Sequence, residues 1–560
     1  MAVVDEIFDR HQLKKSATVV GHSLGTIVAG WIIKERPDIV DRTVLIDPVC
    51  FQLYEAYLCQ NFVYKMPTTG FELVLWYFVA KEACIAWYLG RWFWWHQNIM
   101  FPKDFPSLDQ TQVFLAEKDR IIHAPRVYQY LKRNKVPAIL FEGYGHADAL
   151  LIHTKEQDRM LITRLADIHI DSMYMQNSDP TQFCHRKSAS ASDNTAGKYG
   201  ALGTACDSPI PLVQSVFEYL KKAEFQNVDF IIYTGDTARH VRDMEQSRTY
   251  SELLEEHRYV MNSFDATFNL QTTKLFPTIG NLDTPVHDNI DLASNDNTSG
   301  GIFMELKRLW DPLGLNLTES FSNGGMFVHT IPNGPTIVSI NSMYFFSKNK
   351  QIPDCNEIGS AGAVEMIWLE TQLASAAASR RSVYIISHVP PIKNTKQLYK
   401  PQCYAAYVNL LGKYSNIIAA HLTGHTNEDH LAVLHNTTGS FALQGISKLS
   451  DMTFSINQIS NVLTNSPSII PVNNPGFRIY KYDTTDGTLL GWDQYWTNLQ
   501  QDNVQGNVIW SKEYSSSALY GVNRLDKAGW QQLMQRLLTN KKTFSMYKTY
   551  INVQYQASND

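Results

Sequence analysis

The sequence predicts an α/β protein made of two large domains, and three observations support this prediction. The chain has 560 residues, which is more than a single hydrophobic core usually holds. Short apolar runs alternate with helix-prone stretches in both halves, which is the pattern of a parallel sheet with crossover helices. A segment rich in Ser, Asp, Asn and Gly, residues 177–207, interrupts that pattern, and we expect it to be a surface excursion.

The first predicted domain covers residues 1–155. Its expected strands are residues 17–20, 43–46, 112–115 and 138–141. The aromatic-rich residues 51–105 interrupt the alternation and are expected to form a cap above the sheet. Within the cap, residues 73–95 are apolar for long enough to span a membrane, but Lys81, Glu82 and Arg91 break the run. We therefore expect amphipathic helices here rather than a spanning helix, and membrane association of the cap stays open.

The second predicted domain covers residues 156–495. Its expected strands include residues 228–234, 336–340, 383–387 and 417–422. Helices are expected over residues 365–379 and from Ser251 onward. Residues 496–560 are polar and helix-prone, which predicts a C-terminal helical extension. Arg164 is unusual, because it falls within a strand that should be buried on both faces.

Composition excludes some classes of function. The apolar fraction of 44% and the charged fraction of 18% are those of a folded globular protein. A formal net charge of −5 argues against a nucleic-acid partner bound through overall positive potential. An anionic substrate remains compatible with this charge, because bound metals and arginines can reverse the potential of one cleft.

Cysteines and sequons favour a lumenal location. Cys184 with Cys206, and Cys355 with Cys403, would each close a polar loop in the second domain. Sequons for N-glycosylation begin at Asn297, Asn316 and Asn436. Against this, the first residues lack the apolar core of a signal peptide. We expect an oxidising, lumenal compartment on balance.

The string GHSLG, residues 21–25, has the GxSxG pattern of a nucleophile elbow, a tight turn from strand to helix. Asp119 and His146 follow later expected strands in the order acid then histidine. Together with Ser23 they resemble the α/β-hydrolase family over about residues 18–153, which implies a partial α/β-hydrolase sheet. In that family further strands precede the elbow and supply an oxyanion donor, whereas only twenty residues precede Gly21. Since losing one donor costs about 10²- to 10³-fold in turnover, we expect this triad to have little or no activity.

Five short strings with Asp, His or Asn follow expected strands in the second domain. They are ADIH (166–169), TGDTARH (234–240), IGNLD (279–283), ISHVPP (386–391) and TGHTNEDH (423–430). Strand ends place such groups on short loops, where distant parts of the chain can converge. Carboxylate, imidazole and amide groups hold pairs of divalent cations roughly 3.5 to 4 Å apart, which activate a bridging water. The series therefore predicts a two-metal hydrolase site.

These strings resemble the calcineurin-like metallophosphoesterases, in the branch that contains acid sphingomyelinases and endopolyphosphatases. The resemblance implies a four-layer helix, sheet, sheet, helix sandwich and two divalent metal ions, with Zn, Mn, Mg, Co and Fe as candidates. By the same resemblance, one metal is held by Asp167, His169 and Asn427, the other by Asn281, His388 and His425, and Asp236 bridges them. Asn427 stands where the wider superfamily has a second histidine.

Within that branch, the sequence is most similar to endopolyphosphatases. They share its GHxNxDH string, the Arg-His pair after the GD motif, and the residues 473–482, NNPGFRIYKY. This resemblance implies inorganic polyphosphate as substrate and a vacuolar lumen as location. We expect Arg239 to grip phosphate oxygens, with Arg242 either assisting or lying on a solvated face. His240 is expected to donate a proton or a hydrogen bond to the leaving oxygen.

Three alternatives stay open. The second domain could be a sphingomyelinase-like phosphodiesterase, since that activity belongs to the same branch. The first domain could be an esterase or lipase acting through Ser23. The first domain could also be degenerate and serve only to bind a partner or a membrane surface.

Overall fold

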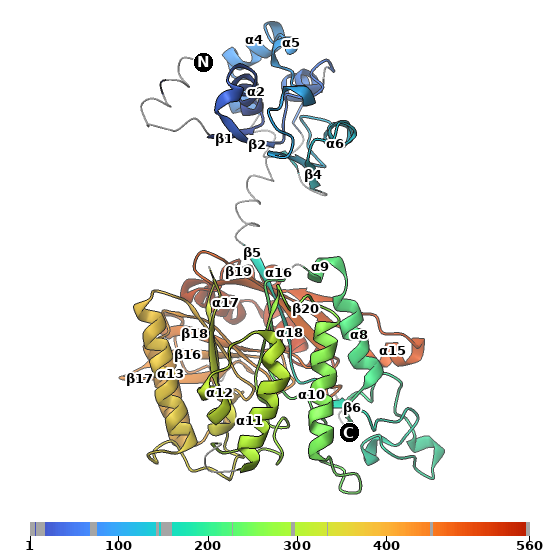
Figure 1. The fold of residues 1–560 in the computed structure, drawn as a ribbon, viewed down its shortest axis with the longest axis vertical. Coiled ribbons are helices and arrows are strands. Elements are labelled where there is room, and N and C mark those ends of the chain that lie inside the picture. Colours follow the sequence, from blue (N-terminus) through green and yellow to red (C-terminus); the bar gives the residue numbers. More distant parts are fainter. Residues whose placement is uncertain are drawn as a thin grey trace. The chain divides into compact units, whose positions relative to one another are not determined.

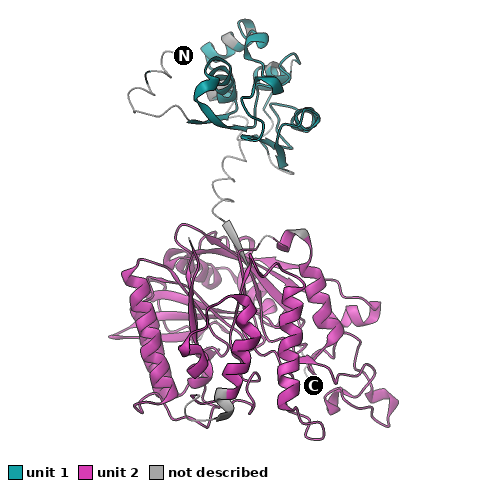
Figure 2. Cartoon of the chain, in the orientation of Figure 1, with its two compact units in different colours: residues 1–157 teal, residues 158–560 magenta. Residues whose placement is uncertain are grey.

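The computed structural model describes residues 6, 17–55, 57–67, 76–141, 145–146, 159–226, 228–292, 297–332, 334–448 and 452–555. The chain divides into two compact units, residues 1–157 and residues 158–560, called unit 1 and unit 2 below (Figure 2). The division falls close to the boundary predicted between residues 155 and 156. Each unit has a hydrophobic core of its own.

Unit 1 is organised around a four-stranded parallel sheet in the order β1-β2-β3-β4. The strands are β1 Ala17–His22, β2 Val40–Ile46, β3 Thr111–Ala116 and β4 Ala138–Phe141. Helix α2 (Gly25–Glu35) follows β1, and helix α6 (Ala124–Arg133) connects β3 to β4. In α6 the buried residues are Ala124, Val127 and Leu131, spaced three and four apart as expected for one helix face. The predicted alternation of strands and helices is therefore present.

The predicted cap is built from short helical segments. They are η2 Cys59–Tyr64, η3 Trp76–Ala80, α4 Ala83–Arg91 and α5 Trp95–Asn98. Its tryptophans are largely solvent-facing, since Trp87 and Trp94 are 56% and 51% exposed. Among the described residues, no helix has both the length and the hydropathy needed to cross a bilayer. Residues 73–75 of the apolar stretch lie outside the described residues.

Unit 2 contains two large mixed sheets. The six-stranded sheet has the order β21-β20-β19-β5-β8-β9, and the seven-stranded sheet has the order β10-β11-β12-β15-β18-β16-β17. Strands of the first are β5 Arg159–Leu165, β8 Phe230–Tyr233, β9 Lys274–Pro277, β19 Gly476–Asp483, β20 Leu489–Trp496 and β21 Ser511–Ser515. Strands of the second are β10 Phe327–Thr330, β11 Thr336–Ser339, β12 Val383–Ile386, β15 Ile418–Thr423, β16 Leu431–Thr437, β17 Ser440–Gly445 and β18 Ile459–Asn465. Short pairs are formed by β6 Ile170–Asp171 with β7 Ser208–Pro209, and by β13 Ile392–Lys393 with β14 Lys396–Gln397.

The two sheets pack against each other through aromatic side chains. Phe230 of β8 lies 6.3 Å from Tyr384 of β12, measured between ring centroids. Tyr233, on the opposite face of β8, instead contacts Phe264 of helix α10 at 5.6 Å. Because successive side chains of a strand point to opposite faces, β8 has one face toward the other sheet and one toward a helix. This is the arrangement of the inner layers of the predicted sandwich.

Helices and further segments surround the sheets (Figure 1). They are α8 Ile210–Leu220, α9 Ala223–Gln226, α10 Tyr250–Asp265, α11 Asn297–Trp310, α12 Glu319–Gly324, α13 Ala361–Ala378 and α14 Pro401–Lys413. α13 contacts β11, and α14 contacts β16 and β17. Helix α10 begins with a capping box, in which Thr249 and Glu252 satisfy each other's backbone N–H groups. The helices predicted from Ser251 and over residues 365–379 are thus confirmed as α10 and α13.

Arg164 is fully buried in β5, and its two terminal nitrogens have hydrogen-bond acceptors. Its guanidinium donates to the carbonyl of Thr423 and, at 3.2 Å, to the hydroxyl of Tyr480. A second fully buried arginine, Arg478 of β19, forms an ion pair with Asp429. A buried cation is costly unless it is paired or hydrogen-bonded. The acceptors for the two terminal nitrogens of Arg164 offset part of this cost, whereas its Nε has no partner among the described residues.

The C-terminal residues are part of unit 2 rather than an extension, which corrects the prediction for residues 496–560. Strand β21 pairs with the edge strand β20. Helices α15 Leu499–Gln505, α16 Ser516–Tyr520, α17 Lys527–Thr539 and α18 Lys541–Ile551 accompany it. Trp530 and Leu533 of α17 are buried in the main core. The polar composition misled the prediction because only one face of each helix is apolar.

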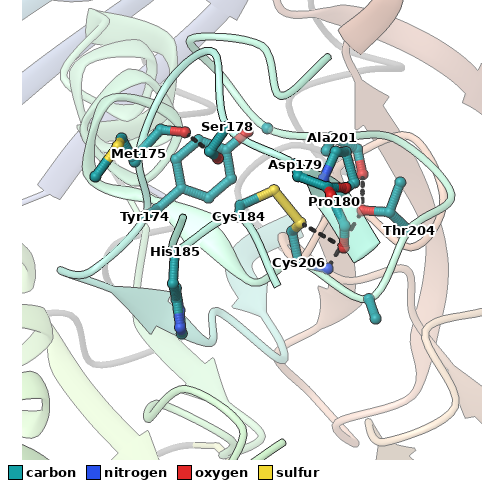
Figure 3. The surroundings of a disulfide bond; sticks show 12 residues. Tyr174, Met175, Ser178, Asp179, Pro180, Cys184, His185, Ala201, Thr204 and Cys206 are labelled. Atoms are coloured by element: carbon teal, nitrogen blue, oxygen red, sulfur yellow. Dashed lines mark hydrogen bonds between the residues drawn. A yellow bond between two sulfur atoms is a disulfide. The ribbon is translucent and has the colours of Figure 1, made fainter. Parts of the chain in front are cut away.

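Both predicted disulfides are present. Cys184 is bonded to Cys206, and Cys355 to Cys403. The first closes the polar excursion, where Asp179 and Thr204 form the local turns around the sulfur atoms (Figure 3). The excursion is therefore tied at its ends, as the cysteine spacing predicts.

Glu365 of α13 generates a prediction about stability and pH. Its side chain is fully buried, and one carboxyl oxygen accepts the backbone N–H of Asn341 at 2.6 Å. Burial raises the pKa of Glu365 well above its ordinary value, so the folded state keeps the proton where the unfolded chain, with a pKa of about 4.3, releases it. The free energy of unfolding should therefore fall as pH rises above that value, by about 1.4 kcal/mol per pH unit.

We expect Glu365→Gln to remove this pH-dependent cost and to raise the melting temperature more under mildly alkaline than under mildly acidic conditions. Thermal unfolding followed by circular dichroism at both conditions measures the effect. Glu370→Gln, on the exposed face of the same helix, is the matched control and should follow the wild-type profile. Parallel profiles for wild type and Glu365→Gln would contradict the argument.

Candidate metal centre

The five predicted strings lie in loops at the carboxyl ends of parallel strands. Asp167 and His169 follow β5, and Asp236 follows β8, in the six-stranded sheet. His388 follows β12, and His425 follows β15, in the seven-stranded sheet. Carboxyl ends of neighbouring parallel strands share one edge of a sheet, so each sheet delivers its polar groups to a single edge.

The side chains from the two sheets meet there. One carboxylate oxygen of Asp236 lies 3.4 Å from Nε2 of His169 and 3.2 Å from Nε2 of His388. The amide oxygen of Asn281 lies 2.9 Å from Nε2 of His388 and 2.8 Å from Nδ1 of His425. Asp167 completes the group, with a carboxylate oxygen 4.0 Å from Nε2 of His169.

Backbone carbonyls orient two of these imidazoles. Nδ1 of His388 is 2.7 Å from the carbonyl oxygen of Thr234, and Nδ1 of His169 is 3.2 Å from that of Ala238. A ring nitrogen that donates to a carbonyl fixes the tautomer, so the other nitrogen is left as a ligand atom. Both rings thus turn Nε2 toward the carboxylate of Asp236.

Unusual backbone conformations are concentrated at these loops. Five predicted ligands have positive φ: Asp167 at 50°, His169 at 44°, Asp236 at 56°, His425 at 69° and Asn427 at 58°. Non-glycine residues in this region cost of order 1 to 3 kcal/mol each and persist where the surrounding structure enforces them. Such clustering is typical of a functional site.

Burial and neighbouring charges shift the pKa values of several side chains in this group. Burial raises the pKa of Asp167 to about 7 and lowers the pKa of His169 to about 4. Burial also opposes protonation of His388, but the carboxylates of Asp236 and Asp167 outweigh it and raise the pKa of His388 to about 9. The crowded carboxylates therefore attract positive charge to this point.

Asp283 connects the loops that follow β8 and β9, and the sequence analysis assigned it no role. Its carboxylate accepts the backbone N–H groups of Asp236, Thr237 and Gly280, each at 2.8 Å. His257 of α10 lies 3.1 Å from the same carboxylate. The carboxylate of Asp236 in turn accepts the N–H of Leu282 at 2.9 Å. The aspartate at the end of IGNLD was the available signal for this role.

His240 lies beside the cluster with a carboxylate partner that was also missed. Oδ1 of Asp207 is 2.7 Å from Nδ1 of His240, and Oδ2 accepts the His240 backbone N–H at 2.6 Å. The His240 ring stacks on His169, with centroids 4.6 Å apart. Burial raises the pKa of Asp207, but His240 outweighs it and lowers this pKa to about 2. Sequence reasoning missed this pair because Asp207 lies in the polar excursion, in a different segment of the chain from His240.

The predicted role of Arg239 is wrong. Its side chain is 1% exposed and donates to both carboxylate oxygens of Glu252, at 2.6 and 3.2 Å. A guanidinium committed to this pair cannot grip a substrate phosphate, so Arg239 stabilises the loop that carries His240. Arg242 is exposed and donates to the carbonyl of Ala205 at 2.9 Å, as the solvated alternative predicts.

The predicted triad of unit 1 is also brought together. Nε2 of His146 lies 2.9 Å from Oγ of Ser23, and Nδ1 of His146 lies 2.7 Å from a carboxylate oxygen of Asp119. These residues come from three separate loops of the four-stranded sheet. Membership of unit 1 in the α/β-hydrolase family stays a prediction.

Comparison with known proteins identifies unit 2. Residues 160–429 match the calcineurin-like phosphoesterase family, and residues 454–559 match the acid sphingomyelin phosphodiesterase C-terminal region. Unit 2 is a calcineurin-like metallophosphoesterase with an acid sphingomyelinase-like C-terminal region. This metallophosphoesterase is a hydrolase of phosphate esters, and the second match covers β18 to α18 and so accounts for the packed C-terminal segment.

Individual relatives of the metallophosphoesterase unit have several activities. Sphingomyelinase phosphodiesterase C of Dictyostelium discoideum is 28% identical over 405 residues, which are 70% of this chain and 81% of that protein. Cyclic GMP-AMP phosphodiesterase SMPDL3A of Rattus norvegicus is 29% identical over 412 residues, 70% of this chain and 84% of that protein. An endopolyphosphatase of Neurospora crassa is 31% identical over 278 residues, but these are 48% of this chain and 37% of that protein.

The residues at the metallophosphoesterase site fit a pair of divalent cations. Oδ2 of Asp167 and Oδ1 of Asn427 are buried with no hydrogen-bond partner among the described residues. Buried acceptors without partners are costly, and a cation would satisfy them. Imidazole nitrogens with carboxylate and amide oxygens are donors suited to Zn, Mn or Fe.

We expect Asp283→Asn to lower the metal content of the purified protein and its melting temperature. One amide N–H₂ would face backbone N–H groups that now donate to a carboxylate, at a cost of about 1 to 3 kcal/mol for each unsatisfied donor. Elemental analysis after dialysis against Zn or Mn, together with thermal unfolding, measures both effects. Asp526→Asn, which keeps a cap at the start of α17, is the control. Full metal content in Asp283→Asn would show that the loops hold their positions without this carboxylate.

Proposed function

We propose that unit 2 is a metal-dependent phosphodiesterase acting on a phosphodiester of lipid or nucleotide type. The observation that carries this proposal is the convergence of Asp236, His169, His388, His425 and Asn281 at one point between the two sheets. Relatives that align over most of their own length support the substrate class, since their names specify sphingomyelinase or cyclic GMP-AMP phosphodiesterase activity.

In this proposal the predicted ligand sets are retained. Asp167, His169 and Asn427 would hold one cation, Asn281, His388 and His425 the other, and Asp236 would be shared. Bound cations would supply a nucleophilic hydroxide at neutral pH and neutralise charge on the phosphoryl oxygens. The residues of the chain position these cations, and the carbonyls of Thr234 and Ala238 hold the two imidazoles in place.

His240 is the proposed proton donor to the leaving oxygen. Asp207 holds Nδ1 of its ring, so the proton available for transfer is on Nε2. Stacking on His169 places the ring at the edge of the proposed cation site. The alkoxide released from a lipid or nucleotide diester is a poor leaving group, so protonation should matter strongly.

Hydrolysis of inorganic polyphosphate is the second candidate. Asn427 in the GHTNEDH string and the 31% identity to an endopolyphosphatase favour it. The shorter alignment and the burial of Arg239 weigh against it, because no phosphate-gripping role remains for that side chain. The two disulfides of unit 2 support the related proposal of an oxidising lumen, such as that of a vacuole.

We expect the full chain to hydrolyse bis-p-nitrophenyl phosphate and either sphingomyelin vesicles or a cyclic dinucleotide, and to lose these activities with chelator. Asp236→Asn should abolish them, because it removes the shared carboxylate charge. Ser23→Ala, in the other unit, is the matched control and should retain full phosphodiesterase activity. Cleavage of long-chain polyphosphate in preference to every diester tested would replace the first proposal with the second.

Leaving-group dependence tests the role of His240. We expect His240→Gln to reduce hydrolysis of a diester with an alkoxide leaving group by about 10²- to 10⁴-fold. A diester that releases p-nitrophenolate needs little protonation, so its rate should fall far less. His329→Gln, a half-buried histidine of β10, is the control. Equal losses on both substrates would exclude His240 as the proton donor.

A further inference from the structure

We propose that unit 1 carries a second active centre, in which Ser23 is a nucleophile acylated by esters with an apolar acyl group. It is separate in chemistry from the phosphodiesterase proposed for unit 2. It also revises the expectation that the triad is inert. The proposal rests on three features of the described part of unit 1: the turn that presents Ser23, the chain of hydrogen bonds behind it, and an apolar hollow lined in part by Leu24, the next residue of the chain.

Ser23 has the backbone of a strained elbow. It lies between β1 and α2 with φ at 51°, a conformation that non-glycine residues adopt at a cost where function requires it. Its N–H donates to the carbonyl of Ile46 at 3.1 Å. The hydroxyl of Thr26 donates to the carbonyl of Ser23 at 2.6 Å. Gly21 permits the tight approach, because a Cβ there would lie 2.9 Å from that of Ala29.

The partners of Ser23 are in place without any rearrangement. One carboxylate oxygen of Asp119 accepts the N–H groups of Ile121 and Ile122, at 2.7 and 3.2 Å. The other oxygen is thereby aimed at Nδ1 of His146, at 2.7 Å. The Asp119 side chain is fully buried, and that of His146 is 9% exposed. Asp119 therefore holds the tautomer in which Nε2 of His146 can accept the proton of Ser23.

An apolar hollow begins at the residue after the nucleophile. It has a volume of 330 Å³ and is lined by Leu24, Trp31, Leu89 and Phe93 among other apolar side chains, with Asn98 at one side. An apolar lining favours the hydrocarbon part of an acyl group over a charged one. The size suits a chain of several methylenes rather than an acetyl group alone.

The proposed reaction is an acyl transfer. Oγ of Ser23 attacks the ester carbonyl carbon while its proton passes to Nε2 of His146. His146 then gives that proton to the alcohol oxygen as the bond between carbonyl carbon and alcohol oxygen breaks, which leaves acyl-Ser23. Water attacks the acyl group with His146 again as base, and the carboxylic acid departs.

The rates of the two stages should differ from those of a full hydrolase. The N–H of Leu24, directly after the nucleophile, is the expected donor to the oxyanion. Each oxyanion donor contributes about 10²- to 10³-fold to the rate of such a stage, and Leu24 N–H is the donor that this proposal assigns. Ser23 should therefore be detected more readily by covalent labelling than by turnover.

The test uses the full chain and a fluorophosphonate probe, which forms an Oγ–P bond to an activated serine with loss of fluoride. We expect stoichiometric labelling, located at Ser23 by peptide mass spectrometry and unaffected by chelator. Ser23→Ala should abolish labelling, and Asp119→Asn should slow it by at least tenfold, since the amide would disturb the tautomer of His146. p-Nitrophenyl octanoate should protect Ser23 from the probe better than p-nitrophenyl acetate.

Asp236→Asn separates this proposal from the previous one. It should lose phosphodiesterase activity and keep full labelling of Ser23. Thermal unfolding of Ser23→Ala and Asp119→Asn confirms that unit 1 is folded in each variant. Failure of the folded wild-type chain to label at Ser23, or equal labelling of Asp119→Asn, would overturn the proposal. Loss of labelling with chelator would point instead to a cation at Asp119 and His146.

Discussion

The phosphoesterase site depends on the carboxylate of Asp283. It accepts three backbone N–H groups from two loops, those that follow β8 and β9, and also contacts His257 of α10. These bonds fix the turn in which Asp236 has a positive φ and direct its side chain toward the other sheet. Gly280 is required beside it, because a Cβ there would lie 2.2 Å from a carboxylate oxygen of Asp236. These contacts hold the backbone that carries Asp236 and Asn281, two of the proposed ligands.

The two sheets provide the second constraint. Their contact relies on aromatic rings such as Phe230 and Tyr384, and on the buried arginines Arg164 and Arg478, which donate to carbonyl and hydroxyl oxygens and to Asp429. The hydrogen bonds and the ion pair of these arginines are directional, so they restrict sliding of one sheet over the other. Apolar contacts alone would tolerate such sliding. Four of the proposed ligands follow strands of the six-stranded sheet and three follow strands of the seven-stranded sheet. The fixed position of one sheet on the other therefore sets the distance between Asp236 and His388.

Sequence reasoning succeeded where the signal was local. Polar residues that end apolar strands indicated the loops that meet at the site, and spacing indicated both cysteine pairs. It failed where a side chain's partner is distant in sequence. Arg239 was expected to face the substrate because its pairing with Glu252 depends on how α10 docks. Asp207 was missed because its position beside His240 depends on how the polar excursion folds back. The substrate could not be predicted from the metal-ligand strings either, since the same ligands serve several phosphate esters.

The disulfide between Cys184 and Cys206 has a consequence for catalysis. Cys206 directly precedes Asp207, so the covalent cross-link ends one residue from the carboxylate that orients His240. The cation ligands, by contrast, are held by strands, backbone carbonyls and Asp283. Under the proposed mechanism, thiol reduction would therefore loosen the support of His240, the proposed proton donor, and spare the proposed cation site. The reduced protein would still bind metal, but it would protonate the leaving oxygen poorly.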